Sequence, residues 1–451
     1  MSRIYLWALA AIFALLAFGA GPSAAQAPGF KVTLTQNGLN YARQVAVDFL
    51  QKAFQSVSLP AQAGIAHAPV LGKVFWELQD IQLSGLSLPD SAITIVPGRG
   101  VNIAMPHMRG RGWLIIDVIG SFINVGIDVG EAGGKPTLAA SSSSCEIGKL
   151  LIKEHGDAIA TGITKLLDSG ANAALSTIPF VEKFGDVAQV DFSLVSAPTF
   201  GGNYLTLNSK GEFTSQAHPV NPPYQPGAMP DEVTGQMMQI MLSQYVGNSA
   251  GYVFQQAGKL HGFLYDKLSP ALMPQRQDLP SWSPIRLNTN SWAHIIPGLT
   301  QKYPNHEMEA ELVASAPPSA SFSPSGIVIN GPGQIVVSVI PPSGQPVPVF
   351  AINIAFSASA SVTVRGGRIY STISYLNSPL SQAWSNVGPI ALSLLDGIIR
   401  TLSTDVIVPF VNYYLSHGVN IPIIEGVQLV NPSIHYGQGY LAISTDISYT
   451  V

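Results

Sequence analysis

One short motif in the chain contains residue types that catalysis requires. Gly247, Ser249 and Gly251 fit the pattern Gly-x-Ser-x-Gly, in which a serine on a sharp strand-to-helix turn attacks an ester. A later Asp and His would complete such a site, and Asp266 and His294 are available. The alternative is that the Ser249 hydroxyl caps a helix that begins near Gly251. Three fixed positions are a weak signal in a chain with 43 Gly, so we expect no catalytic residues and no enzyme, and keep an esterase that uses Ser249 as a rival hypothesis.

A second group of residues has the chemistry to bind phosphate. Arg109 and Arg111 flank Gly110, and Trp113 follows closely. Guanidinium groups form charge-assisted hydrogen bonds with phosphate, and an indole ring suits the boundary between an apolar and a wet region. The group therefore favours a lipid head-group or membrane-surface site. The alternative is a solvated turn with a half-buried Trp.

Metal and nucleic-acid chemistry are not favoured. The 9 His are scattered without ligand spacing, and Cys145 is the single cysteine, so we expect no metal site, no cofactor and no internal disulfide. The formal net charge is -4, and neither half of the chain is basic. Nucleic acid is therefore not an expected partner.

The N-terminus is typical of a secretory signal peptide that covers residues 1–27. Arg3 precedes an uncharged apolar run from Ile4 to Phe18, and Ala25-Gln26-Ala27 offers a small-residue cleavage site. An N-terminal membrane anchor is the alternative, but the run is short for a span. Later in the chain no uninterrupted apolar stretch reaches about 18 residues. We therefore expect a secreted, extracellular protein.

The elements that must position these residues occur twice. "GGNYLTL" begins at Gly201 and "GQGYLAI" begins at Gly437. Further pairs in the same order are Gly38 with Gly251, Pro97 with Pro324, Asp168 with Asp396, Pro179 with Pro409, and Tyr204 with Tyr440. The offset grows only slowly, which indicates two tandem copies rather than many short repeats. The Pro-rich stretch from His218 to Pro230 lies between them and predicts an extended linker.

Each copy has the same order of helices and strands. Helical spacing aligns Leu39, Ala42, Ala46, Phe49 and Ala53 in the first copy and Val253, Ala257, Leu260 and Leu264 in the second. A second helix is predicted from Ile152, Ile159, Ile163 and Leu166, and in the other copy from Ala391, Leu394, Ile398 and Leu402. Alternating segments such as "SAITIVP", "INVGIDV", "IVVSVI" and "FAINIAFSASASVTV" predict strands between them. The fold class is therefore α+β, with a strongly bent antiparallel sheet wrapped around two long helices in each copy.

The composition requires that much apolar surface be hidden from water. Hydrophobic residues make up 47% of the chain and charged residues only 11%, whereas about 25% charge is usual in soluble proteins. Two apolar-faced helices against one sheet can leave a groove between them. The alternative is that the helix stripes are ordinary core.

The residues that follow the predicted cleavage site resemble a known family. "PGFKVTLTQNGLNYA", from Pro28 to Ala42, is similar to the entry signature of the bactericidal/permeability-increasing and lipopolysaccharide-binding protein family. Other landmarks are "GKPTL" at Gly134, "GEF" at Gly211, the "HPVNPP" linker and "LSQYVGNSAGYVFQQAG" from Leu242. The resemblance covers essentially the whole mature chain. At Ser249 it implies the capping role rather than catalysis.

The resemblance implies a boomerang of two tandem, pseudo-symmetric barrels joined by a central sheet. Residues 28–217 would form the N-terminal barrel, 218–245 the Pro-rich linker and central-sheet segment, and 246–451 the C-terminal barrel. Each barrel would carry an apolar tunnel that holds phospholipid. The family also implies an innate-immune, antibacterial role, with lipopolysaccharide as a further ligand and transient contact with a membrane surface.

The chain departs from the family pattern in two places. Cys145 resembles one partner of the family disulfide, but "GANAALSTIPFVEKF" lacks the other, so Cys145 is expected to be a free thiol. The loops that match the basic tip of the first barrel offer only Lys73, Arg109 and Arg111, beside Trp113. Capture of an anionic sugar-phosphate head is therefore less favoured than burial of acyl chains.

The candidate lipid-binding residues come from the helix stripes. They are Leu39, Ala46, Phe49, Ile159 and Ile163 in the first barrel, and Val253, Leu260, Leu394 and Ile398 in the second. Burial stabilises each methylene by about 0.8 kcal/mol, so an acyl chain of about sixteen carbons gains roughly 12 kcal/mol in a dry tunnel. The expected function is burial of phospholipid acyl chains. An extracellular phospholipid or neutral-lipid carrier without antibacterial action is the second hypothesis.

Overall fold

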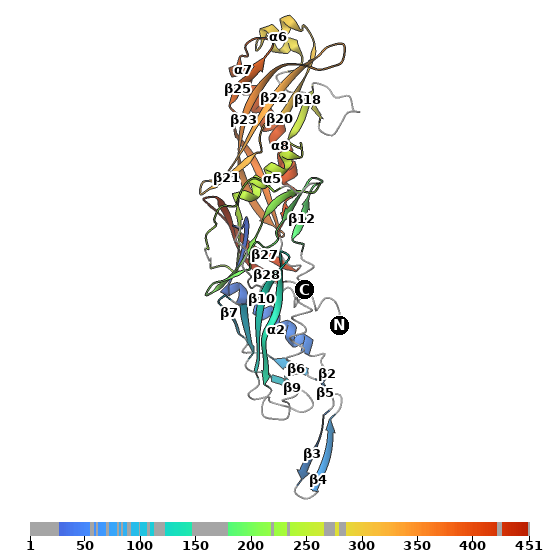
Figure 1. The fold of residues 1–451 in the computed structure, drawn as a ribbon, viewed down its shortest axis with the longest axis vertical. Helices are drawn as coiled ribbons and strands as arrows, with labels where there is room; N and C mark the ends of the chain where they lie inside the picture. Colours follow the sequence, from blue (N-terminus) through green and yellow to red (C-terminus); the bar gives the residue numbers. More distant parts are fainter. Residues whose placement is uncertain are drawn as a thin grey trace.

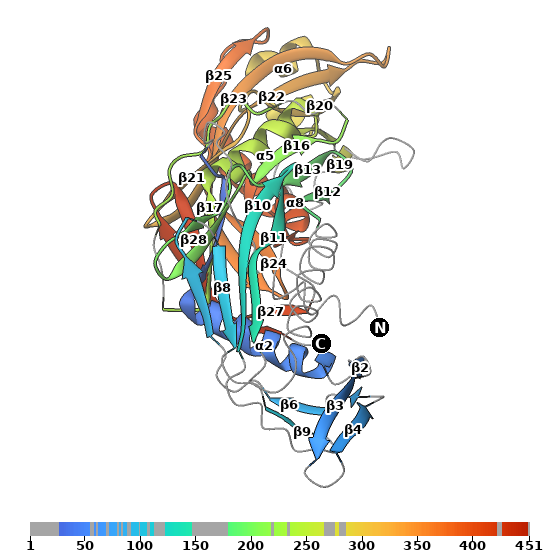
Figure 2. The same cartoon turned by 60° about the horizontal axis from the view of Figure 1, so that its bottom comes forward.

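The computed structural model describes residues 27–54, 58–59, 62–68, 72–78, 81–82, 84–87, 92–98, 100–105, 109–111, 122–146, 179–217, 221–231, 235–265, 276–278, 286–421 and 426–449. The predicted signal peptide lies almost entirely outside the described residues. The same is true of the helix predicted around Ile159. Figures 1 and 2 show an elongated molecule with sheets along its length and few helices, which agrees with the predicted α+β class.

A six-stranded antiparallel sheet lies in the middle of the molecule (Figure 1). From edge to edge its strands are β14 (Thr199–Phe200), β15 (Tyr204–Ser209), β1 (Phe30–Thr35), β17 (Met238–Ser243), β28 (Tyr440–Tyr449) and β27 (Val427–Gly437). The strand that opens each copy, β1 or β17, lies in the centre, and the strands that close each copy flank this pair in matching order. The symmetry confirms the internal duplication.

The repeated Gly and Tyr have a physical reason. Tyr204 and Tyr440 begin the closing strands, opposite Thr35 and Ser243 respectively. A Cβ atom on Gly201 would lie 2.4 Å from the ring of Tyr204, and one on Gly437 would lie 2.2 Å from the ring of Tyr440. Each tyrosine ring therefore packs directly on a glycine, and both residues must recur together.

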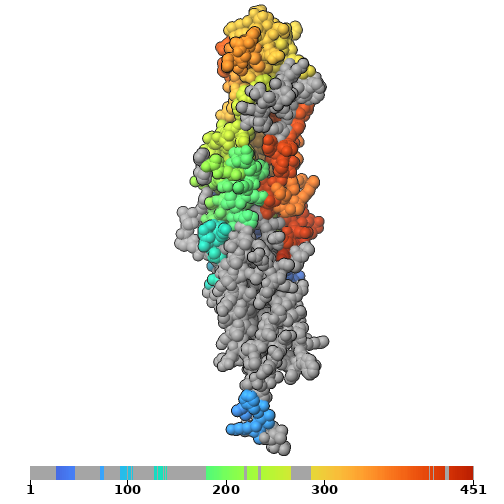
Figure 3. Space-filling model, turned by 90° about the vertical axis from the view of Figure 1, so that its right-hand side faces the viewer, coloured from blue at the N-terminus to red at the C-terminus, as the bar shows by residue number. Residues whose placement is uncertain are grey.

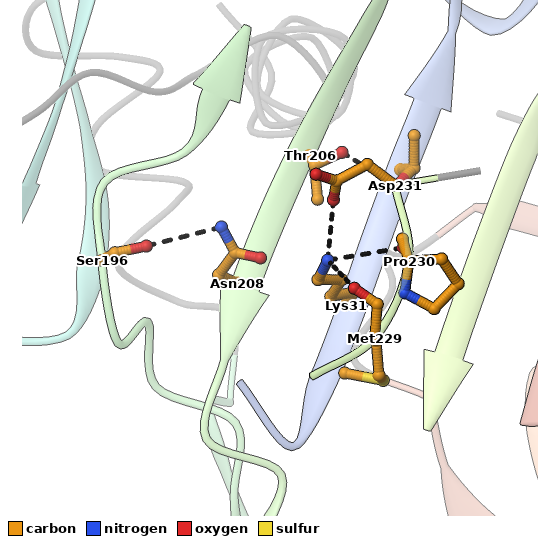
Figure 4. Close-up of polar contacts among 8 residues, drawn as sticks. Lys31, Ser196, Thr206, Asn208, Met229, Pro230 and Asp231 are labelled. Atoms are coloured by element: carbon orange, nitrogen blue, oxygen red, sulfur yellow. Dashed lines mark hydrogen bonds and ion pairs between the residues drawn. The ribbon is translucent and has the colours of Figure 1, made fainter. Parts of the chain in front are cut away.

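The Pro-rich linker covers one face of this central sheet (Figure 4). The buried Lys31 of β1 donates a hydrogen bond to the Met229 carbonyl at 2.9 Å and forms an ion pair with Asp231 at 2.7 Å. Met229 itself packs against Met241 and Ala442 of the sheet. Burying the Lys31 cation without these partners would cost free energy. The linker is therefore held in place over the sheet.

In the described part of its first half the chain adds a four-stranded sheet and one long helix. The sheet has the order β11 (Lys135–Glu146), β10 (Phe122–Ala132), β8 (Gly100–Met105) and β7 (Ala92–Val96). The predicted helix around Leu39 is α2 (Gln36–Phe54), and Leu39 is fully buried.

Three two-stranded sheets lie beyond these elements, toward one end of the molecule (Figures 1 and 2): β2 (Ser58–Leu59) with β5 (Ile81–Gln82), β3 (Gln62–Ala68) with β4 (Gly72–Leu78), and β6 (Ser84–Ser87) with β9 (Arg109–Arg111).

The second half is built on a nine-stranded sheet. Its strands are β18 (His261–Tyr265), β19 (Arg276–Asp278), β20 (Glu307–Ala314), β21 (Ser319–Ser323), β22 (Gly326–Ile340), β23 (Val347–Arg365), β24 (Arg368–Asn377), β25 (Leu380–Ser385) and β26 (Val419–Asn420). Its helical segments are α5 (Gln244–Gln256), η2 (Thr289–Trp292), α6 (Pro297–Lys302), α7 (Leu392–Leu402), η3 (Ser403–Ile407) and α8 (Val408–Leu415). The predicted strand segments of both copies are confirmed.

A small sheet connects the two halves. It consists of β12 (Val181–Phe184), β13 (Ala188–Asp191) and β16 (Glu212–Ser215). The Asn420 side chain of β26 donates a hydrogen bond to Glu182. Burial raises the pKa of Glu182, and the Asn420 hydrogen bond and the positive charge of Arg368 only partly oppose this effect.

Helix α5 ends earlier than the sequence predicts. The aligned residues Ala257, Leu260 and Leu264 suggested a longer helix, but α5 stops at Gln256 and β18 follows. Gly258 adopts a φ of 66°, and the Lys259 and Gly258 N–H groups donate to the Phe254 and Gln255 carbonyls. This is the Schellman arrangement that terminates helices, so the glycine overrides the apolar spacing.

The helix predicted around Leu394 exists, but a different side of it faces the core. α7 buries Leu395 and Ile399, whereas Leu394 is 53% exposed and Ile398 is half-buried. The helix continues through η3, a π-helical turn, into α8, which has Pro409 in its first turn. Because proline lacks an N–H and crowds the preceding turn, the widened turn accommodates it.

The predicted equivalence of Gly38 and Gly251 is wrong. Gly38 lies in the first turn of α2, but Gly251 lies in the middle of α5. The two glycines serve different contacts. A Cβ atom on Gly38 would lie 2.4 Å from the Met237 carbonyl oxygen, and one on Gly251 would lie 2.3 Å from that of Pro318.

Two large apolar clusters form most of the core of the described residues, beside the small cluster of Met229, Met241 and Ala442. The main cluster runs through the central sheet and joins both halves, from Ile93 and Leu39 to Val253 and Phe322. The distal cluster lies in the second half around Trp292, Phe350 and Leu395. The two clusters are separate, so the second half has apolar packing at both of its ends.

Candidate functional site

Ser249 lies where no strand-to-helix turn exists. It sits inside α5, is fully buried, accepts a hydrogen bond from the Phe213 N–H at 3.0 Å and donates one to the Val246 carbonyl at 3.0 Å. Asp266 is outside the described residues, and His294 is an exposed residue after η2. The helix begins at Gln244, and its N-cap is Ser243, whose Oγ accepts from the Tyr245 N–H. The esterase hypothesis and the predicted capping role of Ser249 are therefore both wrong.

The neighbourhood of Ser249 fastens α5 to the small sheet. The Tyr245 hydroxyl donates a hydrogen bond to Glu212 of β16. Burial raises the pKa of the Tyr245 hydroxyl well above its usual value, and the Glu212 hydrogen bond and charge raise it further. Tyr245 therefore remains a protonated donor, which suits a structural contact.

Replacement of Ser249 tests this structural role. We expect Ser249→Ala to lower the free energy of unfolding by about 1–3 kcal/mol, because the buried Phe213 N–H loses its acceptor. Chemical denaturation measures the change, and the exposed Ser393 of α7 provides a control in Ser393→Ala. An ester-hydrolysis assay run on the same proteins should give equal background rates. A hydrolysis rate that disappears in Ser249→Ala alone would contradict the assignment.

The inner face of the nine-stranded sheet is the candidate site. Along β23, Phe350 and Ile352 face the distal cluster, and Ala360 and Val362 pack against the main cluster from the same side of the strand. On the opposite side of the strand Ala351 is buried, but Asn353, Ala355 and Ser361 are exposed to solvent. The alternation gives β23 one continuous apolar face that spans both clusters.

Between the two clusters this face carries apolar residues that are only partly covered. Phe356 is half-buried, pairs with Gly331 of β22, and has its ring centroid 6.1 Å from that of Tyr375 on β24. A Cβ atom on Gly331 would have the Phe356 ring as its nearest neighbour, at 3.9 Å, whereas one on Gly333 would lie 3.1 Å from the Val313 carbonyl. We call Gly331, Gly333, Phe356 and Tyr375 the inner apolar surface. No other described atom lies within 4 Å of the Cβ position at Gly331, so the described residues leave space there.

Helix α8 closes one edge of this region. The Asn412 side chain accepts a hydrogen bond from the Ile373 N–H at 2.7 Å and donates one to the Ile373 carbonyl at 3.0 Å. These bonds satisfy the free edge of β24 in place of another strand. The helix thereby forms the border of the inner apolar surface along this edge of β24.

The structure places the predicted lipid-binding residues in different surroundings. Leu39 and Val253 are buried in the main cluster, Leu260 is half-buried after the end of α5, Ile398 packs against the distal cluster, and Leu394 is exposed. Ala46 and Phe49 lie on α2, but their side chains are outside the described residues, as are Ile159 and Ile163 altogether. The five candidates whose side chains are described do not lie together at one site.

The predicted head-group residues lie in the two-stranded sheets at one end of the molecule. Lys73 is exposed on β4, and Arg109 and Arg111 belong to β9. Trp113 is outside the described residues. Cys145 lies on β11 opposite Ile123, and its predicted free thiol remains a prediction.

Sequence reasoning missed the inner apolar surface. The signal was present, because "INGPGQIVV" and "INIAFSASA" combine strand alternation with small residues. The pairing of Gly331 with Phe356 depends on strand register. The apolar spacing of the helices, from which the candidate residues were chosen, contains no information about that register. Within the described ranges no group of three or more His, Cys, Asp or Glu could hold a metal ion, and no helix there is long and apolar enough to cross a membrane.

Comparison with known proteins places this fold. The model of the C-terminal domain of the LBP / BPI / CETP family matches residues 182–449. A bactericidal permeability-increasing protein of Sebastes schlegelii is 27% identical over 94% of this chain and 96% of its own length. A lipopolysaccharide-binding protein of Homo sapiens is 26% identical over 98% of each chain.

A solved structure shows the same fold. The crystal structure of lipopolysaccharide binding protein superposes with a TM-score of 0.61 and 23% identity, and covers 94% of this chain and 99% of that one. The matched domain model spans more than half of the chain. The chain belongs to the LBP / BPI / CETP family, whose BPI and LBP members bind lipid and are not enzymes.

Proposed function

We propose that the chain is a secreted protein that buries the acyl chains of phospholipid in apolar interiors. In this proposal residues 28–217 and 246–451 are two tandem barrels arranged as a boomerang, and residues 218–245 link them. The signal peptide of residues 1–27 directs the protein out of the cell. The symmetric central sheet supports the tandem arrangement, because each half contributes equivalent strands to it.

The observation that carries the proposal is the inner apolar surface. Phe356 and Tyr375 keep apolar area uncovered between two packed clusters, and among the described residues Gly331, opposite Phe356, has open space beside it. Burial of apolar area from water stabilises by about 25 cal/mol per Å². An acyl chain that lies along this surface would gain that free energy and complete the packing between the clusters.

The candidate lipid-binding residues from the predicted helices would lie at different distances from the lipid. Leu260, Leu394 and Ile398 keep accessible surface and would contact acyl chains directly. Leu39 and Val253 would support the wall from behind. Ala46, Phe49, Ile159 and Ile163 would line the interior of the first barrel.

Lipopolysaccharide is a second proposed ligand through its acyl chains. Two of the similar proteins carry names that denote lipopolysaccharide binding and bactericidal permeability increase, which supports an innate-immune role. Lys73, Arg109 and Arg111 would then contact the phosphates, together with Trp113, while the protein touches a membrane surface transiently. Since the net charge is -4, a lipid carrier or transfer protein without antibacterial action remains the competing function.

Mass spectrometry of the native protein tests the proposal. We expect phospholipid to co-purify with the secreted protein and to leave it on solvent extraction. A lipid-free preparation that also takes up no phospholipid from vesicles would refute acyl-chain burial. Lipopolysaccharide binding measured at low and high salt distinguishes contact with the phosphates from burial of the acyl chains. Binding through phosphates weakens as salt screens the charges.

A further inference from the structure

The central sheet has a second face, on the side opposite the main cluster. Along β1, Val32 and Leu34 pack into the main cluster, so Lys31 and Thr33 lie on the other face. One face of an antiparallel sheet is commonly solvated, but here Lys31 is only 7% exposed and Thr33 only 5%. This face lies in the middle of the molecule, far from the β3–β4 hairpin that projects at one end (Figures 1 and 3).

A row of buried polar side chains crosses four strands of this face. Thr206 of β15 pairs with Thr33 of β1, Thr33 pairs with Gln239 of β17, and Gln239 pairs with Ser444 of β28. We call these four residues the polar row. Each of them is at most 8% exposed, and the hydroxyls of Thr33 and Thr206 share a hydrogen bond of 2.9 Å.

The fold does not require polar residues at these positions. Counted from the helix that follows each strand, Thr33 of β1 corresponds to Met241 of β17. Counted from the repeated tyrosines, Thr206 corresponds to Ala442. Met241 and Ala442 pack with Met229 of the linker, so the second copy fills the equivalent space with apolar atoms. The hydroxyls of the first copy therefore call for a reason other than sheet packing.

The polar row contains an acceptor that is not used. The Nε2 group of Gln239 donates to the Ser444 hydroxyl at 3.5 Å, but its Oε1 atom has no hydrogen-bond partner. Gln239 is only 2% exposed, and a buried acceptor without a donor is unfavourable. The site lacks one donor, such as a hydroxyl group, that the described residues do not supply.

Lys31 lies beside the polar row and takes its anion from the linker. It is two residues from Thr33 on β1, which places the two positions about 7 Å apart along the strand. The Lys31 Nζ atom is 2.7 Å from the Asp231 carboxylate (Figure 4). The Asp231 side chain is 64% exposed, whereas that of Lys31 is 9% exposed. A carboxylate thus approaches the buried cation from the solvent side, where another carboxylate could replace it.

We propose that Lys31 and the polar row form a binding site for an acidic sugar, with the Asp231 carboxylate as its built-in competitor. The sugar carboxylate takes the place of Asp231 at the Lys31 ammonium group, and the linker lifts locally as Asp231 leaves. Ring hydroxyls reach Thr33 and Gln239, and one of them donates to the Gln239 Oε1 atom. A uronic acid carries a carboxylate and several hydroxyls on one ring, so it supplies both groups that the site lacks once Asp231 has left.

Titration calorimetry of the full chain with glucuronate tests the site. Asp231→Asn removes the competing charge and should tighten glucuronate binding about tenfold, because the ligand no longer has to displace a charged hydrogen-bond partner. Acetate lacks the hydroxyls and glucose lacks the carboxylate, so each should bind Asp231→Asn at least tenfold more weakly than glucuronate does. Asp186→Asn, which removes a carboxylate that pairs with Lys259, is the matched control and should leave the affinity unchanged.

Two further substitutions in the Asp231→Asn background separate the parts of the site. Lys31→Met removes the charge and should abolish glucuronate binding, with circular dichroism as the check on folding. Gln239→Leu removes the unused acceptor and should weaken glucuronate about tenfold while acetate binding stays the same. Equal affinities for glucuronate, glucose and acetate, or glucuronate binding that survives Lys31→Met, would overturn the site.

The source of the sugar and the independence of the site need two comparisons. Tighter binding of free glucuronate identifies a small molecule, tighter binding of a uronate-containing oligosaccharide identifies a glycan, and either result supports the site. Phospholipid co-purification should be the same in all of these variants, because the polar row and the main cluster lie on opposite faces of the sheet. Failure of the sugar site would therefore leave acyl-chain burial standing, and a lipid-free protein that binds glucuronate would refute acyl-chain burial alone.

Discussion

Gly331→Leu should weaken the binding of phospholipid on the order of 100-fold. The added side chain has four carbons, enters the space beside Phe356 and displaces a similar length of acyl chain. At about 0.8 kcal/mol per methylene the loss is about 3 kcal/mol, and each 1.4 kcal/mol is tenfold in affinity. Titration of delipidated protein with a fluorescent phospholipid measures the dissociation constant.

The effect on folding should be small, because leucine suits a strand better than glycine does. The control is Ala355→Leu, which places the same side chain on the exposed side of β23, next to Phe356. It should bind lipid as the wild type does. Equal affinities for Gly331→Leu and Ala355→Leu would show that acyl chains do not lie on the inner apolar surface.

Gly251→Ala should destabilise the second half of the molecule by about 2 kcal/mol. The new Cβ atom would lie 2.3 Å from the Pro318 carbonyl oxygen, so α5 must shift away from the segment that leads into β21. Overpacking of this kind costs about 1–3 kcal/mol, and backbone atoms yield less easily than a flexible side chain. The midpoint of chemical denaturation should fall accordingly.

A second helical glycine provides the matched control. Gly397 of α7 is exposed, and a Cβ atom there meets no described atom within 4 Å. Gly397→Ala should therefore stabilise the protein by about 0.5–1 kcal/mol, since alanine is the better helix former. If both substitutions move the midpoint in the same direction, the close contact between α5 and Pro318 is not what requires glycine at position 251.

The rejected esterase hypothesis shows why a motif needs its structural context. The spacing of Gly247, Ser249 and Gly251 is present in the sequence, but it falls inside a helix rather than on a turn. Ser249 has both of its hydrogen-bonding roles occupied by Phe213 and Val246. A hydroxyl that is buried and bonded in this way cannot reach a substrate.

The helix predictions were correct where local signals agreed. The apolar spacing around Leu39 predicted α2, and the structure confirms it. Around Leu260 the same kind of spacing failed, because Gly258 can adopt a positive φ and end α5 before that residue. Around Leu394 two neighbouring faces of the helix both carry apolar residues at helical spacing. Packing against the sheet buried the face with Leu395 and Ile399.

The sequence by itself determined the class of fold, the duplication and the family resemblance. Strand alternation and helical spacing are local properties, and the repeated Gly and Tyr of the closing strands reflect a contact within three residues, Gly201 with Tyr204 and Gly437 with Tyr440. Such short-range requirements remain readable in one chain.

Only the tertiary structure decided which apolar residues are covered and which are left open. The register of β22 against β23 brings Gly331 to Phe356, and that of β3 against β4 brings Ile65 to Phe75. Burial depends on what packs over a residue from distant parts of the chain, whereas apolar character alone is the same for a core residue, a ligand-contacting residue and an exposed surface residue. The inner apolar surface and the pairing of Ile65 with Phe75 therefore became visible only once the strands were placed side by side.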